Sequence, residues 1–200
     1  LTSAINNTQA MNSALESAPA LITPFSDNSL SEQFAAVAKT ISVQAKLSTQ
    51  RQVFFVSMGG YDTHDNQLTT HPALLNTLAQ GLSEFDSAMK ELDMADKVTT
   101  FTMSDFGRTL TSNGDGTDHG WAGNQIVMGG AVKGGNIYGE LLTQHLDGPQ
   151  DTGGGRLIPS VANEQYFATL AQWFGVPSSE LADIFPNLSN FDYTTLDFFV

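Results

Sequence analysis

A long helical pattern between two short apolar runs limits the folds open to this chain. In residues 72–92, apolar side chains recur at intervals of three and four, so they share one face of a helix. Residues 52–58 (QVFFVSM) and 97–103 (KVTTFTM) flank this pattern, and their β-branched and aromatic content is typical of buried strands. A strand, a helix and a second strand in this order predict a parallel pair joined by a crossover helix.

A third short run, residues 125–128 (QIVM), closes at Gly129 and Gly130 and predicts a third strand. We therefore expect an α/β fold in which a mostly parallel sheet is flanked by helices. Three clear strands in 200 residues are few for a doubly wound sheet, so we expect an incomplete sheet with strands missing upstream. The prediction is a single α/β domain over residues 1–200 that forms the C-terminal half of a larger domain. Residues 1–28 are expected to be an irregular or helical lead-in.

The remaining segments predict shorter helices and loops. The spacing of Ser29 and Glu32 matches a capping box, and the periodicity after it predicts a helix over residues 34–47. A second helix is predicted over residues 164–174, ending at a glycine, and a shorter one over residues 178–184. The glycine-rich stretch before them and the aromatic tail after them predict, respectively, loops with short strands and a segment that docks on the body of the domain.

Charge and composition exclude several classes of function. The net charge is −13 with only eight lysines and arginines, so nucleic acid is not an expected partner, because phosphate contacts need clustered cations. Such acidity is typical of exported proteins and of proteins from salty environments. With no cysteine, a metal here would be held by oxygen and imidazole ligands. No apolar run reaches the length of a membrane helix, so no span is predicted. The chain begins at Leu1, so we expect a processed chain or a fragment.

Polar motifs adjoin the predicted strands. GGYDTHD (59–65) follows the first strand, SDFGRT (104–109) follows the second, and TDHGW (117–121) precedes the third. Ligands of open parallel sheets bind beyond the carboxyl ends of the strands. We therefore expect the carboxylate and imidazole groups of these motifs to converge on one edge of the sheet.

Asp62, His64 and His119 are the main candidates for metal ligands. Asp62 and His64 lie two residues apart, which puts both on the same side of an extended chain, and His119 would join them from a distant loop. One carboxylate and two imidazoles suit Zn²⁺, Mn²⁺ or Fe. The alternative is that Asp62 caps the next helix and that His64 is an ordinary loop residue.

Asp105 and Arg108 allow two interpretations each. Asp105 would be a further metal ligand or a carboxylate that orients one, and otherwise the partner of a local ion pair or turn. Arg108 would grip an anionic substrate through two hydrogen bonds, and otherwise neutralise Asp105. The loop 113–118 has the composition of a calcium loop, but Asn124 stands where that motif needs a glutamate, so an EF-hand is not expected.

Four motifs, taken in order, resemble a known family. They are GGYDTHDNQ (59–67), SDFGRT (104–109), GTDHGWAGNQ (116–125) and MGGAVKGGNIYG (128–139). The set resembles the bacterial family numbered 1501 among domains of unknown function, whose members are similar to alkaline phosphatases and sulfatases. The resemblance extends over residues 52–186 and implies an alkaline-phosphatase-like fold.

The resemblance implies a role for each polar residue of these motifs. Asp62 and His64 match the Asp and His of the superfamily's first metal site, and His119 resembles the late His that completes it. Asp118 would be a metal-site residue that supports His119 by a hydrogen bond without binding the metal itself. Asp105 matches the Asp of an Asp-His pair on a second metal.

The partner of Asp105 in that pair is missing, because Phe106 stands where the His would be. The implied metal is zinc, with manganese, magnesium and calcium as alternatives. The superfamily's nucleophile lies in the N-terminal half of the domain and has no counterpart in this chain.

Three functions follow as hypotheses. The resemblance implies a metal-dependent hydrolase of phosphate or sulfate esters, in which Asp105 and Arg108 serve catalysis on an anionic small-molecule or polymeric substrate, and which is exported to the periplasm or secreted. The alternative is a non-catalytic protein of the cell envelope that keeps the fold and a relic metal site. The third is a domain whose polar loops only cap helices.

Overall fold

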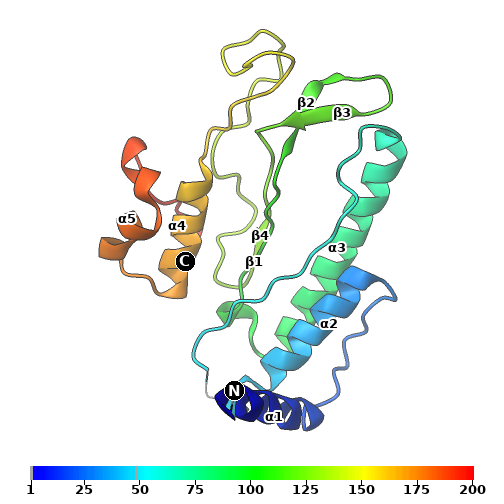
Figure 1. The fold of residues 1–200 in the computed structure, drawn as a ribbon, viewed down its shortest axis with the longest axis vertical. Coiled ribbons are helices and arrows are strands. Elements are labelled where there is room, and N and C mark those ends of the chain that lie inside the picture. Colours follow the sequence, from blue (N-terminus) through cyan, green and yellow to red (C-terminus); the bar gives the residue numbers. More distant parts are fainter. Residues whose placement is uncertain (1, 48) are drawn as a thin grey trace. The chain divides into compact units, whose positions relative to one another are not determined.

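The computed structural model describes residues 2–47 and 49–200 (Figure 1). Its backbone contacts divide the chain into two compact units. The first unit comprises Leu1–Asp62 and Leu68–Val98. The second unit comprises Thr63–Gln67 and Thr99–Val200. The short segment 63–67 therefore belongs with the C-terminal part of the chain, although helical residues of the first unit follow it directly.

The first unit is helical. Its helices are α1 (Thr2–Glu16), α2 (Ser29–Ser42) and α3 (Gln67–Glu91), with 3₁₀ turns at Gln44–Lys46 and Ala95–Lys97. The helix predicted over residues 72–92 is confirmed, but it begins earlier, and Pro72 lies inside it. The predicted lead-in proves to be a helix followed by an irregular stretch.

Helices α2 and α3 pack through apolar faces whose residues repeat at three and four. Phe34 of α2 stacks on Phe85 of α3, with ring centroids 4.9 Å apart. Gly81 lets the helices approach, because a Cβ there would lie 3.2 Å from Leu30 and Phe34. The buried apolar residues of the two faces are Leu30, Phe34, Ala38, Ile41, Leu82, Phe85, Ala88 and Met89.

The start of α2 corrects the prediction that Ser29 caps it. Asn28 is the N-cap, and its side chain accepts a hydrogen bond from the Ser31 backbone N–H at 3.0 Å. Asn28 has the extended backbone that a cap requires, while Ser29 is already helical. The helix also ends at Ser42, before the predicted end at residue 47, and a separate 3₁₀ turn follows.

Residues 52–58 do not form the predicted strand. Within the described part of the chain they are assigned no strand, and Val53 and Phe55 are 77% and 80% exposed. The backbone N–H and C=O of Ser57 are instead bound by the side-chain amide of Gln33, both at 2.9 Å. An apolar run forms a buried strand only where another strand or layer covers it. The sequence of the run does not show whether such a partner is present.

The predicted parallel sheet is also wrong. The described residues form two separate two-stranded sheets, both antiparallel: β1 (Thr100–Phe101) with β4 (Val127–Met128), and β2 (Gly107–Ser112) with β3 (Thr117–Gly120). The second and third predicted strands therefore shrink to two-residue strands that run in opposite directions. The chain reverses in a tight turn after β2, where Gly114 has a φ of +125°. A short turn of this kind is enough to join two antiparallel strands.

Strands β2 and β3 were not predicted, because they lie in segments that the sequence indicates as loops. Their residues, GRTLTS and TDHG, are mostly polar, and three of them, Gly107, Thr109 and Gly120, are buried. The strands of an antiparallel hairpin can be mostly polar. A prediction that looks for apolar runs does not find such strands.

The C-terminal elements confirm the predictions for that region. Helix α4 (Asn163–Phe174) ends at Gly175, which adopts a left-handed φ of 109°, and 3₁₀ turn Ser178–Glu180 leads into α5 (Leu181–Ile184). A last 3₁₀ turn covers Pro186–Asn190.

The aromatic tail packs on α4, as predicted. Phe198 is buried with Tyr166 and Leu170, and burial raises the pKa of the Tyr166 hydroxyl. The backbone N–H of Lys133 donates to the Phe198 carbonyl at 2.9 Å.

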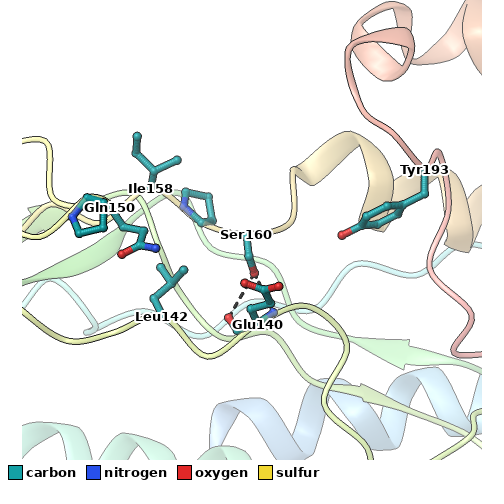
Figure 2. Close-up of a pocket in the computed structure, with 8 residues that line it drawn as sticks. Glu140, Leu142, Gln150, Ile158, Ser160 and Tyr193 are labelled. Atoms are coloured by element: carbon teal, nitrogen blue, oxygen red, sulfur yellow. Dashed lines mark hydrogen bonds between the residues drawn. The ribbon is translucent and has the colours of Figure 1, made fainter.

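The loops between β4 and α4 carry a shallow groove (Figure 2). Its volume is about 400 Å³, and its lining mixes apolar and polar side chains. Ser160 closes one part of it, because its hydroxyl accepts the Glu140 N–H at 2.9 Å. Among the described residues, no helix is long and apolar enough to cross a membrane, as the sequence predicts.

Candidate metal centre

Backbone hydrogen bonds join the segment 63–67 to the β2–β3 hairpin. His119 lies on β3, directly opposite Arg108 on β2. The segment 63–67 adds to the hairpin through the Gln67 N–H, which donates to the Asp115 carbonyl at 3.1 Å. His64 is thereby brought to the same part of the molecule as His119, although 54 residues separate them in the sequence.

The structure brings Asp62, His64 and His119 together. One potential ligand atom from each of the three lies within 4.8 Å of the other two, and all three residues are exposed. Asp62 ends a segment of the first unit, and its peptide bond to Thr63 joins it to the segment that carries His64. These three residues are the candidates that the sequence places at a first metal site, and their binding of a metal stays a prediction.

The two imidazoles lie close together and are stacked. Their ring centroids lie 5.1 Å apart, and the ring planes differ by 28°. Two imidazoles bound to a tetrahedral zinc ion at Zn–N distances of about 2.0–2.1 Å would also have their centroids roughly 5 Å apart, but each ring would turn so that one of its nitrogens points at the ion. With a carboxylate oxygen from Asp62, the donors form the N₂O set found in zinc sites that keep a fourth position open.

Asp118 contacts His64 rather than its neighbour His119. Its Oδ1 lies 3.2 Å from His64 Nδ1, and both side chains are about half exposed. The same oxygen accepts a hydrogen bond from the Asn113 side-chain amide at 3.3 Å. A carboxylate on Nδ1 holds the ring in one orientation and leaves Nε2 as the atom for a metal. The structure therefore places this predicted metal-site residue beside the other histidine.

Phe106 covers one face of His119. The two rings are stacked almost parallel, with centroids 3.9 Å apart and an angle of 6° between them. Arg108 Cζ also lies over the Phe106 ring, 5.7 Å from its centroid. The resemblance implies a histidine ligand of a second metal at the position of Phe106. An apolar ring stands there instead and packs on His119.

Arg108 binds the protein backbone in this structure. Its Nε donates to Thr117 Oγ1 at 2.9 Å, and its Nη2 donates to the carbonyls of Thr63 and Thr117. Asp105 is exposed, precedes β2 and does not belong to the group of three potential ligands. The catalytic roles of Asp105 and Arg108 stay predictions.

Sequence reasoning missed Gly116 and Thr63. Gly116 is buried against the backbone of residues 63 and 64, and Thr63 is buried between two exposed candidate ligands. Nothing in the local pattern distinguishes Gly116 from the other glycines of the same loop. The position of Thr63 between Asp62 and His64 is a signal that marks it as a residue whose backbone sets their geometry.

Comparison with known proteins identifies one family. A model of the family described as "Protein of unknown function (DUF1501)" matches residues 7–149, more than half of the chain. No curated protein and no solved structure gives a significant match. The matched range contains all the residues of the candidate centre.

Proposed function

We propose that this chain, which belongs to the family described as "Protein of unknown function (DUF1501)", is a metal-dependent hydrolase of phosphate or sulfate esters. The observation that carries the proposal is the convergence of Asp62, His64 and His119 within 4.8 Å. A relationship to alkaline phosphatases and sulfatases, and export to the periplasm or the exterior, are parts of the same proposal and rest on the four sequence motifs.

The chemistry assigns a distinct task to each residue. Asp62, His64 and His119 would hold a divalent metal, with zinc favoured by the imidazole and carboxylate donors. Such a metal supplies a Lewis acid that polarises an ester oxygen and stabilises the charge that develops on it. Asp118 holds the His64 ring through Nδ1, and the Phe106 ring shields one face of His119 from water.

Metal analysis tests the binding step. The chain, purified without chelator, is expected to contain close to one equivalent of zinc by mass spectrometry. The variant His64→Ala/His119→Ala is expected to lose it, whereas His145→Ala, which removes an exposed imidazole away from the centre, keeps it. Equal metal in the parent and the double variant would reject the proposed ligand set.

Ester hydrolysis tests the catalytic step on the protein as it occurs in the cell. A panel of phosphate and sulfate esters, with zinc, manganese or magnesium added, is expected to reveal activity that disappears with His119→Ala. A metal-loaded protein that hydrolyses none of these esters would reject the enzyme.

The second candidate is a non-catalytic metal protein of the cell envelope. The stacking of Phe106 on His119 favours it, because an apolar ring cannot ligate a second metal. Under this alternative the zinc content of the parent is retained, and the only effect of losing the metal is a loss of stability. The ester panel therefore separates the two candidates.

A further inference from the structure

The approach of His64 to His119 depends on how the segment 63–67 lies on the β2–β3 hairpin. This segment is short, and both candidate ligands at its start are exposed, so their own side chains contribute little burial to hold it. Two of its contacts with the hairpin join backbone atoms. The Thr117 N–H points at the Thr63 carbonyl, 3.5 Å away, and the Gln67 N–H bonds the Asp115 carbonyl at 3.1 Å.

Gly116 makes that close contact sterically feasible. A Cβ at this position would lie 2.4 Å from the Thr63 carbonyl oxygen and 2.4 Å from the carbonyl carbon of His64. Both are backbone atoms, so no side-chain rotation would relieve the overlap, and the segment would have to move. The position is not one where only glycine tolerates the backbone angles, since Gly116 is absent from the residues with positive φ. The requirement for glycine is therefore one of space.

Arg108 supplies the attachment at the same place. Its guanidinium bridges the Thr63 carbonyl on the segment and the Thr117 carbonyl and hydroxyl on β3. Thr63 lies between Asp62 and His64 in the chain, and Thr117 lies two residues before His119. One planar group thus joins the backbones next to all three candidate ligands, which a guanidinium does through several donors in a fixed geometry.

We propose that Gly116 and Arg108 are positioning residues that hold the segment 63–67 on the hairpin and so set the distance between His64 and His119. The role of the centre as a metal site rests on the proposed function, whereas the docking of the segment does not. Arg108 then acts on the site through Thr63 and Thr117, and the grip on an anionic substrate expected from sequence is not needed to explain its place.

Zinc affinity measures the effect of positioning. Gly116→Ala is expected to weaken zinc binding by about 10- to 100-fold while leaving the stoichiometry at one, because all ligands remain but their geometry is lost. Gly134→Ala is the matched control, since a Cβ there meets nothing within 4 Å and its φ is not in the left-handed region. An unchanged zinc affinity in Gly116→Ala would overturn the proposed effect on the site.

Hydrogen exchange provides a readout that needs no metal. The amides of Gln67 and Thr117, which bond across the contact, are expected to lose protection in Gly116→Ala and Arg108→Ala, while the amides of α4 stay protected and report that the unit is folded. Unchanged protection at both amides would overturn the docking. If the parent binds no zinc but these amides lose protection in the variants, the proposed function fails and the positioning of the segment stands.

A series at Arg108 separates positioning from substrate binding. Arg108→Lys retains a donor for the two carbonyls but loses the bond from Nε, so zinc affinity is expected to fall in the order parent, Arg108→Lys, Arg108→Ala. A substrate clamp gives a different result: KM for an anionic ester rises, while zinc affinity and amide protection stay at the parental values. That second pattern would reject the positioning role.

Discussion

Two loops of the molecule are each held by the hydrogen bonds of one side chain, which we call a tether. One tether is a carboxylate and the other is a guanidinium. In the first unit, the stretch around Ile22 and Thr23 is held on α3 by Glu91, whose carboxylate accepts both backbone N–H groups at 2.7 and 2.8 Å. In the second unit, the segment 63–67 is held on the hairpin by Arg108, which donates to backbone carbonyls. One tether binds donors and the other binds acceptors.

The difference lies in what each loop exposes. The loop at Ile22 and Thr23 carries no histidine, and its one carboxylate, Asp27, does not belong to the group of potential metal ligands, so its tether only fixes the chain. The segment 63–67 exposes His64 and adjoins Asp62, so its tether also fixes the geometry of a candidate site. The same physical device is structural in one unit and is proposed to be functional in the other. Variants in the two units are therefore expected to separate effects on stability from effects on ligand geometry.

The largest expected effect on stability comes from the core of the first unit. Phe34→Ala removes a buried ring that stacks on Phe85, and is expected to lower the free energy of unfolding by about 3–5 kcal/mol. Zinc affinity, measured where the variant is still folded, is expected to stay at the parental value. Urea unfolding checks the first expectation and titration with zinc the second. Leu75→Ala, at a half-exposed position on α3, is the matched control. If zinc affinity fell as well, the core of the first unit could no longer be said to affect stability alone.

A change at Asp118 is expected to lower zinc affinity and to leave stability close to the parental value. Asp118→Asn weakens the acceptor on His64 Nδ1 and is expected to lower zinc affinity by about 10- to 100-fold, with an unfolding midpoint close to that of the parent. Asp115→Asn removes an exposed carboxylate of the same turn, whose backbone carbonyl still accepts the Gln67 N–H, and controls for the loss of charge. Equal zinc affinities in Asp118→Asn and Asp115→Asn would show that only the local charge matters.

Helices were predictable from this sequence because their signal is local. The three-and-four spacing after Pro72 and the glycine at position 175 each indicate an element from residues within one or two turns. Sheet pairing is not local. Residues 52–58 have the composition of a strand, but composition does not specify a partner, while the polar strand β2 forms because β3 lies beside it.

The candidate site shows the same division. Asp62, His64 and His119 could be singled out because their side-chain chemistry is visible in the sequence, and the structure brings them together. The contact of Arg108 with Thr63 could not be predicted, since it depends on a backbone carbonyl 45 residues away in the chain. The need for space at Gly116 is likewise visible only once both backbones are placed.

The smallest expected effect tests the carboxylate tether through pH. Hydrogen bonds from the Ile22 N–H, the Thr23 hydroxyl and the Thr23 N–H lower the pKa of Glu91 below its ordinary value of 4.5. A carboxyl whose pKa is lower in the folded state contributes stability above the unfolded pKa, and this contribution is lost as the pH falls through the folded pKa. The urea midpoint of the parent is therefore expected to fall slightly more, between pH 6 and pH 3, than that of Glu91→Gln.

The comparison with Glu91→Gln isolates one carboxylate among 21 acidic residues, because the background titration is common to both proteins. Glu16→Gln removes an exposed carboxyl at the end of α1 without touching this tether and serves as the matched control. The zinc affinity of Glu91→Gln at pH 7 is expected to equal that of the parent, since this tether holds a loop without ligands. A loss of zinc affinity there would mean that the two tethers are coupled, and would remove the reason for treating one as structural and the other as part of the site.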